Sequence, residues 1–142
     1  MDATAAYAIS ASGLRAQRLR MDVIAANLAN AQSTRTPAGG PYKRHEVVFE
    51  AAPGAGTFDD ALNSSNPGVR VSRIVEDQNP PQLLFEPGHP DADARGYVAM
   101  PNVNVITEMV DMMSATRAYE ANVAALNATK RLLEAALEIG RS

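Results

Sequence analysis

The positions of proline and glycine constrain this 142-residue chain more than any other feature. All nine prolines lie between Pro37 and Pro101, and seven of the nine glycines lie between Gly39 and Gly96. Proline removes a helical hydrogen-bond donor and glycine costs backbone entropy, so long helices are favoured only outside this interval. The predicted class is mostly α with a small β region (α+β). Its three segments are an N-terminal helical segment at 1–36, an irregular β-containing region at 37–101 and a C-terminal helical segment at 102–142.

The first segment carries a seven-residue repeat of apolar residues within a predicted helix at 4–31. The repeat consists of Tyr7, Leu14, Met21 and Leu28, with Ile24 and Ala31 on a second line. Apolar residues at heptad spacing form a narrow stripe that follows a partner helix, as in a coiled coil. Gly13 is the weak point, because glycine destabilises a helix interior by roughly 0.5–1 kcal/mol relative to alanine.

The last segment repeats the pattern over a longer predicted helix at 104–139. Its heptad positions are Val105, Met112, Tyr119, Leu126 and Leu133, accompanied by Met109, Val123 and Leu137. Asn102 or Asn104 is suited to cap the start, and Gly140 is suited to end the helix. At 1.5 Å per residue, the two helices would be about 40 and 55 Å long. We expect them to pair in a coiled-coil-like manner in an extended molecule, with both termini side by side.

The middle region contains short apolar runs that are bounded by turn residues. These runs predict strands at 46–49, 69–75, 82–85 and 96–100, and the segment 52–68 between the first two is predicted to be a mobile loop. Val69 and Val71 alternate with Arg70 and Ser72, as expected for a half-buried strand. The middle region is therefore expected to be a small β structure carried between two long helices.

Composition indicates that the helices need partners. Aromatic residues make up only 5% of the chain, and alanine supplies much of the 46% hydrophobic content. Burial stabilises at roughly 25 cal/mol per Å² of apolar surface, and an alanine side chain has little surface to bury. The chain therefore gains little from folding alone.

Several function classes find no support in the sequence. A net charge of -3 does not favour nucleic acid, which requires a clustered basic surface. The absence of cysteine excludes disulfides and thiolate metal sites. No run of about 18 apolar residues predicts a membrane span, and the acidic Asp2 and interrupted apolar pattern near the start indicate no cleaved secretory signal.

The stretch from Glu86 to Asn102, "EPGHPDADARGYVAMPN", resembles a calcium-binding loop. Counted from Asp91, it has Asp93 at the third position and glycine at the sixth. A calcium loop also needs an oxygen ligand at the fifth position and a bidentate glutamate at the twelfth, where this chain has Arg95 and Asn102. We interpret the stretch as a joint between the β region and the last helix, in which Arg95 pairs with one of the two aspartates.

Other side chains that could take part in catalysis or metal binding are also better explained by structural roles. His45 has no accompanying nucleophile signature and is predicted to be an exposed strand residue. Lys43 and Arg44 are predicted to be a surface or subunit contact. The methionines at 109, 112 and 113 have no histidine or cysteine near them, so packing is favoured over a soft-metal site. We predict no catalytic residue, no metal ligand and no cofactor.

Two long motifs resemble those of bacterial flagellar rod and hook proteins. The stretch "SGLRAQRLRMDVIAANLANAQS", 12–33, is similar to the N-terminal signature of that family, and "EMVDMMSATRAYEANVAALNATK", 108–130, is similar to its C-terminal signature. Between them, "GGPYKRHEVVFE", 39–50, and "PGHPDADARGYVAMPNVN", 87–104, resemble the proximal rod members in particular. The resemblance covers almost the whole chain, and 52–68 is its least distinctive part.

This resemblance implies a structural subunit of the flagellar basal body, in the rod that crosses the periplasm. Family members are exported through the flagellar type III apparatus without cleavage of a signal peptide. Their terminal helices form the inner, coiled-coil-like layer of a helical tube that transmits torque. The implied partners are further copies of the chain, the rod proteins FlgB, FlgF and FlgG and the adaptor FliE. No nucleic acid, small-molecule substrate or direct membrane insertion is implied.

In such a protein the functional residues are interface residues. The candidates are Leu14, Met21, Ile24, Asn27, Leu28 and Asn30 in the first helix, with Met109, Met112, Tyr119, Asn122, Val123, Leu126 and Leu133 in the second. Polar residues at helix contacts fix register at some cost in stability, which is the role expected of the asparagines. The sequence leaves open which face packs within the subunit and which meets a neighbour.

Two alternatives come from other classes. One is an enzyme or a small metal-binding protein that uses His45 and the loop of His89, Asp91 and Asp93. The other is a free-standing coiled-coil adaptor, which would form stable helical oligomers as the isolated protein.

Overall fold

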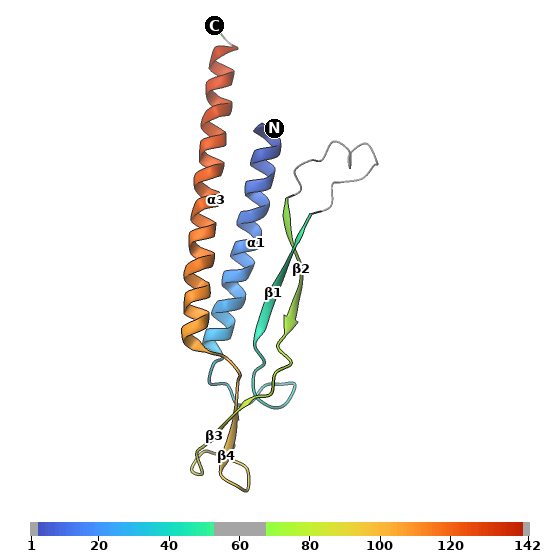
Figure 1. The fold of residues 1–142 in the computed structure, drawn as a ribbon, viewed down its shortest axis with the longest axis vertical. Helices are drawn as coiled ribbons and strands as arrows, with labels where there is room; N and C mark the ends of the chain where they lie inside the picture. The colour runs from blue at the N-terminus through green and yellow to red at the C-terminus, as the bar shows by residue number, and fades with distance from the viewer. Residues whose placement is uncertain (1–2, 53–67, 141–142) are drawn as a thin grey trace.

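The fold is an elongated pair of helices with two small hairpins. The structure, a computed structural model, describes residues 3–52 and 68–140. Its elements follow in the order α1 (Ala3–Ala29), β1 (His45–Ala51), β2 (Val69–Glu76), β3 (Gln82–Phe85), β4 (Tyr97–Met100) and α3 (Val105–Ile139). Figure 1 shows α1 and α3 side by side, with the start of α1 and the end of α3 at the same end of the molecule. The predicted class and the extended shape are confirmed.

The long helix α3 begins at a capped turn. The side chain of Asn104 accepts hydrogen bonds from the backbone N–H groups of Ile106 and Thr107, at 3.0 and 3.2 Å. This cap satisfies two of the donors that a helix leaves unpaired at its start. Of the two predicted caps, Asn104 is therefore the one used, whereas Asn102 accepts a hydrogen bond from Gln82. At the other end, α3 stops at Gly140, as predicted.

Both hairpins are antiparallel. In the first, His45 of β1 lies opposite Glu76 of β2, and the register shifts between Val48 and Phe49. In the second, Phe85 of β3 lies opposite Tyr97 of β4. Each predicted strand lies within about two residues of the observed one. The predicted loop at 52–68 lies almost entirely outside the described residues.

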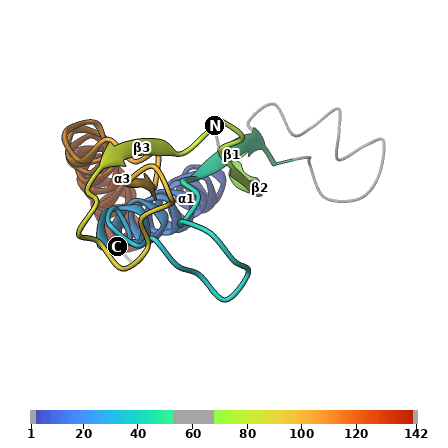
Figure 2. The same ribbon diagram turned by 90° about the horizontal axis from the view of Figure 1, so that it is seen from below.

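Helix α1 lies between α3 and the β1–β2 hairpin, as the view along the long axis shows (Figure 2). The buried apolar side chains of the described residues are few: Ala16, Ile24, Val98, Val103 and Ala115. Two of them are alanines, so the core contributes little apolar area, as the composition predicted. The described helices include none that is long and apolar enough to cross a membrane.

The buried line of α1 differs from the predicted one. Gly13, Ala16, Ile24 and Asn27 are buried, whereas Tyr7, at the start of the predicted repeat, is 45% exposed. The prediction assumed one partner helix, but α1 contacts α3 on one side and the hairpin on the other. Its most buried line therefore faces between these two partners rather than toward α3 alone.

Candidate assembly interface

The thirteen predicted interface residues lie in α1, in the turn after it and in α3. Ile24 and Asn27 are buried, whereas Met109 is 56% and Leu133 is 37% exposed. The other nine are half-buried: Leu14, Met21, Leu28, Asn30, Met112, Tyr119, Asn122, Val123 and Leu126. Most of these residues thus pack partly within the chain, and their role between subunits stays a prediction.

The two helices approach each other closely at Gly13. A Cβ atom at this position would lie 2.8 Å from Oδ1 of Asn122, which is tighter than carbon and oxygen tolerate. Asn122 is held there by its own hydrogen bond to the carbonyl of Ala118, at 2.9 Å. Further along, the hydroxyl oxygen of Thr116 lies 3.6 Å from Sδ of Met21, and its hydrogen is donated within α3 to the carbonyl of Met112 at 2.8 Å. Gly13, which the sequence marked as a weak point, is therefore where the interhelical contact requires a small residue.

The side chain of Asn27 is fully buried and fully hydrogen-bonded. Its Oδ1 accepts from the backbone N–H of His45 at 2.9 Å and from the hydroxyl of Tyr42 at 3.0 Å. Its Nδ2 donates to the carbonyl of His45 at 2.8 Å and to Oε2 of Glu108 at 3.0 Å. Because both donors and both acceptor positions of the amide are used, no other side chain of this size substitutes for it. Asn27 therefore joins α1, β1 and α3 at one point.

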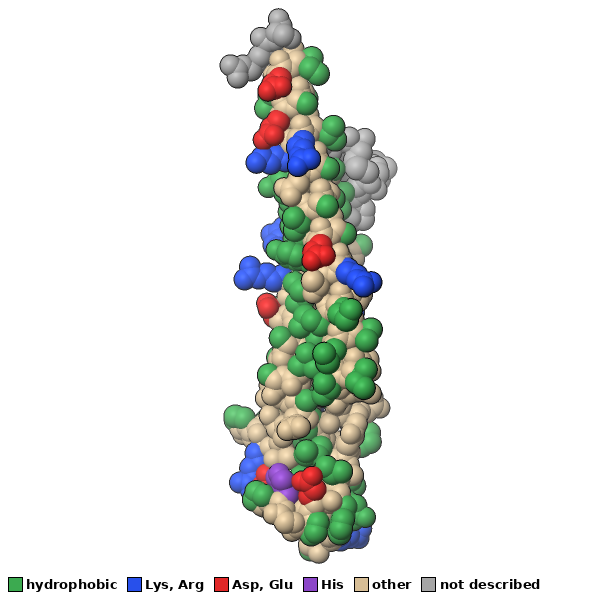
Figure 3. Space-filling view, turned by 90° about the vertical axis from the view of Figure 1, so that its left-hand side faces the viewer, with side chains coloured by type: hydrophobic (Ala, Val, Ile, Leu, Met, Phe, Trp, Pro, Cys, Tyr) green, Lys and Arg blue, Asp and Glu red, His purple; other side chains and the backbone are tan. Residues whose placement is uncertain are grey.

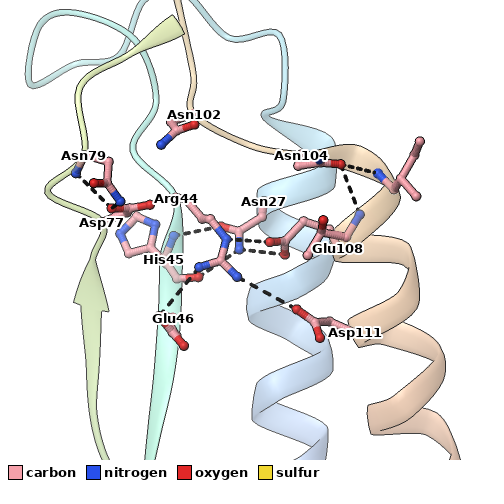
Figure 4. Close-up of polar contacts among 12 residues, drawn as sticks. Asn27, Arg44, His45, Glu46, Asp77, Asn79, Asn102, Asn104, Glu108 and Asp111 are labelled. Atoms are coloured by element: carbon pink, nitrogen blue, oxygen red, sulfur yellow. Dashed lines mark hydrogen bonds and ion pairs between the residues drawn. The ribbon is translucent and has the colours of Figure 1, made fainter.

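A buried ion pair completes this polar cluster (Figure 4). Nε of Arg44 donates to Oε1 of Glu108 at 2.6 Å, and the Glu108 side chain is only 1% exposed. A buried carboxylate is costly unless it is paired and hydrogen-bonded, and Glu108 is both. We call Asn27, Tyr42, Arg44, His45 and Glu108 the polar clasp, because they tie the start of β1 to both helices.

Electrostatics in the polar clasp favour the charged pair. Burial alone lowers the pKa of Arg44, but the hydrogen bond and charge of Glu108, with the charges of Glu46 and Asp111, outweigh it and the pKa is raised. Burial raises the pKa of Tyr42, and the negative charge of Glu108 adds to this effect. Arg44 therefore stays a cation and Tyr42 stays a hydroxyl donor at neutral pH.

His45 is the first residue of β1, and its side chain belongs to this cluster. Its Nδ1 lies 2.9 Å from the hydroxyl oxygen of Tyr42, and its side chain is 33% exposed. Tyr42 donates its one hydroxyl hydrogen to Asn27, so Nδ1 of His45 acts as the donor to Tyr42. The predicted strand position of His45 is confirmed, but its side chain is half-buried rather than exposed, because it packs back onto the residue three positions earlier in the chain.

Helix α3 also has a second apolar face that points away from α1. Ile106, Met109, Val110 and Met113 are between 56% and 75% exposed. At 3.6 residues per turn, they lie opposite Glu108 and Ala115, which are buried against the rest of the chain. Figure 3 shows hydrophobic side chains gathered on this side of the molecule. We call these four residues the outer face of α3.

The loop that resembles a calcium site uses its carboxylates for local structure. Asp91 accepts a hydrogen bond from Thr34 and forms an ion pair with Arg35. Asp93 accepts from the backbone N–H groups of Arg95 and Tyr97, at 2.8 and 2.9 Å. In the described part of the chain, no three acidic or histidine side chains gather as metal ligands would. The cation that pairs with Asp91 is therefore Arg35, whereas Arg95, which was predicted to pair with one of the two aspartates, contacts Asp93 through its backbone N–H.

The polar clasp has little signature in the sequence. Arg44 was interpreted as a surface or subunit contact, but it forms an ion pair inside the chain. Glu108 is an acidic residue in the first turn of α3, where a carboxylate is favourable even when it is exposed, yet its side chain is buried. The apolar pattern of the last helix includes Met109 and not Glu108, so no local signal in the sequence indicates the buried carboxylate.

Comparison with known proteins matches both ends of the chain to family models of flagellar basal-body rod proteins. A family model described as "Flagella basal body rod protein" matches residues 8–35. A second, described as "Flagellar basal body rod FlgEFG protein C-terminal", matches residues 94–139. The matched ranges contain Asn27 and Glu108, which meet in the polar clasp.

Curated relatives match over nearly the full length. The flagellar basal-body rod protein FlgC of Borreliella burgdorferi is 46% identical over 143 residues, which is 92% of this chain and 93% of the relative. FlgC of Escherichia coli O6:H1 is 47% identical over 137 residues, covering 95% and 96% of the two chains. FlgC of Bacillus subtilis is 46% identical over 144 residues, covering 94% and 95%.

Proposed function

Because this chain belongs to the FlgC family of flagellar basal-body rod proteins, we propose that it builds the proximal rod through its terminal helices, which pair as a coiled coil in a helical tube. It is a structural subunit of that rod. The proposal concerns how the subunit is held, and it rests above all on the outer face of α3. A tube in which α3 contacts a neighbour would cover this face.

The outer face of α3 is unusual for a chain with so few large apolar residues. Ile106 is 75% and Met113 is 57% exposed on the first turns of the helix. Contiguous exposed apolar surface of this kind marks a protein contact. Methionine suits such a contact, because its flexible side chain adapts to several non-identical neighbours. The face would thus serve a subunit surrounded by copies of itself and by different rod proteins.

Torque transmission requires that each subunit move as one body. The polar clasp supports this role, since Asn27 and Arg44 tie α1 and β1 to Glu108 at the start of α3. The interactions cross from one end of the sequence to the other, so the hairpin cannot turn independently of the helices. Function then resides in contacts between subunits, and we propose no catalytic activity.

The neighbours and location are also proposals. We propose FlgB, FlgF, FlgG and the adaptor FliE as partners beside further copies of the chain. The rod would cross the periplasm, and the chain would reach it through the flagellar export apparatus without cleavage of a signal peptide. The free-standing adaptor is disfavoured by the full-length similarity to rod proteins.

The test places a charge on the outer face of α3. Met113→Glu and Ile106→Glu change exposed side chains, so the soluble chain should keep its helical content by circular dichroism. In a flagellated host that depends on this chain, the amount of each variant in isolated basal bodies should be at least tenfold lower than that of the wild-type chain. Swimming should stop. Thr107→Glu adds the same charge at an exposed polar position and serves as the matched control. Normal incorporation of Met113→Glu and Ile106→Glu into basal bodies would refute the proposal.

A further inference from the structure

The β1–β2 hairpin lies along α1, and both of its strands contact this helix (Figure 1). The polar clasp attaches one end of the hairpin, because the side chain of Asn27 bonds to both backbone groups of His45, the first residue of β1. A single attachment would fix where the hairpin begins and would leave its far end free to turn. A fixed position along α1 therefore requires a second contact.

This second contact is made by Ser12. Its Oγ accepts a hydrogen bond from the backbone N–H of Val69, the first residue of β2, at 3.0 Å. The Ser12 hydroxyl in turn donates to the carbonyl of Ile9, one turn earlier in α1, at 2.7 Å. The hydroxyl hydrogen is thus used within the helix, which leaves the oxygen as an acceptor for the strand.

Gly68 lets the strand come close enough for this bond. A Cβ atom on Gly68 would lie 2.6 Å from Oγ and 3.2 Å from Cβ of Ser12, so a side chain here would push the strand away from the helix. The carbonyl of Gly68 also accepts from the N–H of Ala52 at 2.7 Å, which joins the end of β1 to the same point. We call Ser12 and Gly68 the distal anchor.

The two attachments are equally spaced on the helix and on the hairpin. Ser12 and Asn27 are about 22 Å apart along α1, at 1.5 Å per residue. Along β1, His45 is about 20 Å from Ala51, which lies opposite Val69. Both attachments can therefore form together. The shortest slip that keeps the same side chains facing α1 is two residues, about 7 Å, and it would break both of them.

Side-chain packing between the two attachments is incomplete. A hollow of about 410 Å³ beside the distal anchor has Leu19 and Val71 among its lining residues. Another of about 210 Å³, beside the polar clasp, is lined in part by Ile24 and Phe49. Closely packed interiors have few voids larger than a water molecule, and apolar contact is non-directional. The position of the hairpin along α1 therefore depends on the hydrogen bonds at its two ends.

We propose that Ser12 is a positioning residue that, together with Gly68, fixes the β1–β2 hairpin along α1 so that the subunit fits its neighbours in the rod. Ser12 acts through the backbone of Val69 and needs no contact with another subunit. A hairpin held at both ends moves with α1 as one body, whereas a hairpin held only by the polar clasp would turn about it. The inference rests on the proposed function, because assembly of the rod is where the fixed position is used.

Hydrogen exchange of backbone amides, followed by NMR in the full-length chain, tests whether Ser12 holds the hairpin. Ser12→Ala should raise the exchange rate of the Val69 N–H at least tenfold, while that of His45 in the polar clasp stays within twofold. Thr129→Val is the matched control, because Thr129 also donates its hydroxyl hydrogen to a carbonyl one turn earlier, that of Ala125 at 3.0 Å. Unchanged exchange at Val69 in Ser12→Ala would overturn the inference.

A disulfide tests the position of the hairpin, because the chain has no cysteine of its own. In Ser12→Cys/Gly68→Cys the Cβ atoms would lie 3.2 Å apart, close to the roughly 3.5–4.5 Å of disulfides. Mild oxidation of the purified chain should close this bond within one molecule. Leu19 lies two turns further along the same face of α1, about 10 Å away, so Leu19→Cys/Gly68→Cys should stay reduced. Equal closure of both pairs would show that the hairpin slides, and would overturn the inference.

Basal bodies from a host that lacks its own copy test the use of this position in assembly. Ser12→Ala/Gly68→Ala should lower the amount of incorporated chain at least threefold, with unchanged helical content by circular dichroism. Ser12→Cys/Gly68→Cys, joined by its disulfide in the oxidising periplasm, should be incorporated to within twofold of the wild-type chain. This rescue separates a fixed position from the hydroxyl itself.

The outcomes distinguish this inference from the proposed function. Normal incorporation of Ser12→Ala/Gly68→Ala, or equal losses in the alanine and cysteine pairs, would overturn the inference. Neither result affects the proposed function, since that depends on Met113→Glu and Ile106→Glu. If those two charged variants are incorporated normally, the proposed function fails, whatever the exchange rate at Val69.

Discussion

Nδ2 of Asn27 lies 3.0 Å from Oε2 of Glu108, and this contact joins two helices that are 81 residues apart in the chain. Both side chains are buried, at 0% and 1% exposed. Each also bonds to the segment before or within β1, Asn27 through the backbone of His45 and Glu108 through Arg44. One amide and one carboxylate therefore determine how the hairpin sits on the helix pair.

Replacing Asn27 should destabilise the chain strongly. Asn27→Leu keeps the approximate volume but leaves the backbone groups of His45 and the hydroxyl of Tyr42 without their partner. Each buried polar group left unpaired costs about 1–3 kcal/mol, so we expect the free energy of unfolding to fall by about 3 kcal/mol. Urea titration followed by circular dichroism measures this change. The partly exposed Asn30 is the matched control, and Asn30→Ala should cost less than about 1 kcal/mol. Equal effects at both positions would contradict the role of Asn27.

The second prediction concerns the buried ion pair of Arg44 and Glu108. Arg44→Met leaves the Glu108 carboxylate buried without a counter-ion, and the expected loss is about 3 kcal/mol. The double variant Arg44→Met/Glu108→Leu removes both charges and should recover most of that loss, because a buried pair often exchanges for apolar residues at little cost. The exposed pair of Arg70 and Glu50 is the control, and Arg70→Met should change stability by less than about 1 kcal/mol. A double variant as unstable as Arg44→Met would show that packing, rather than charge, is responsible.

The elements that could be predicted have local signals. Proline and glycine positions separate the helices from the middle, and the Asn104 cap and the alternating residues of β2 identify their elements within a few positions. The stripe of α1 was misplaced because a heptad pattern indicates that a helix has a partner, without saying how many. Tyr7 satisfies the pattern and is nevertheless 45% exposed.

The candidate site was predicted less completely, because its contacts join distant segments. Arg44 and Glu108 are 64 residues apart, and neither carries a local mark of its partner. Asn27 is predicted to set the register of a helix contact, and its burial fits that role within the chain. Met109 lies on the predicted stripe of α3 but faces outward, since the buried position of that turn belongs to Glu108.

Acid should weaken the joint between the turn after α1 and the loop before β4. The hydrogen bond from Thr34 is the largest cause that lowers the pKa of Asp91 from 3.8, burial opposes it, and Arg35 lowers it further. Because the folded-state pKa lies below the unfolded value, the stabilisation is present above about pH 4 and is lost as pH falls through the folded pKa. Asp91→Asn should flatten the fall in stability between about pH 5 and pH 2.

Thr34→Val separates the hydrogen bond of this joint from its ion pair. It removes the hydroxyl donor but leaves Arg35 beside Asp91. The fall in the free energy of unfolding at acid pH should therefore become only partly less steep. Unfolding titrations across the same pH series measure both variants. If stability falls equally between about pH 5 and pH 2 in the wild-type chain and in Asp91→Asn, this carboxylate does not contribute to the acid dependence of stability.

The close approach of α1 and α3 at Gly13 sets two effects against each other. Alanine is a better helix former than glycine by about 0.5–1 kcal/mol, which alone would make Gly13→Ala stabilising. The new methyl group would meet the Asn122 side chain at 2.8 Å, and overpacking costs about 1–3 kcal/mol. We expect the clash to prevail, so Gly13→Ala should be destabilising by about 1 kcal/mol. In the Asn122→Ala background the clash is absent, and the same substitution should instead stabilise by about 0.5–1 kcal/mol. Urea unfolding of the four chains gives the coupling energy, and effects that simply add would mean that the helices separate enough at this position to admit a side chain.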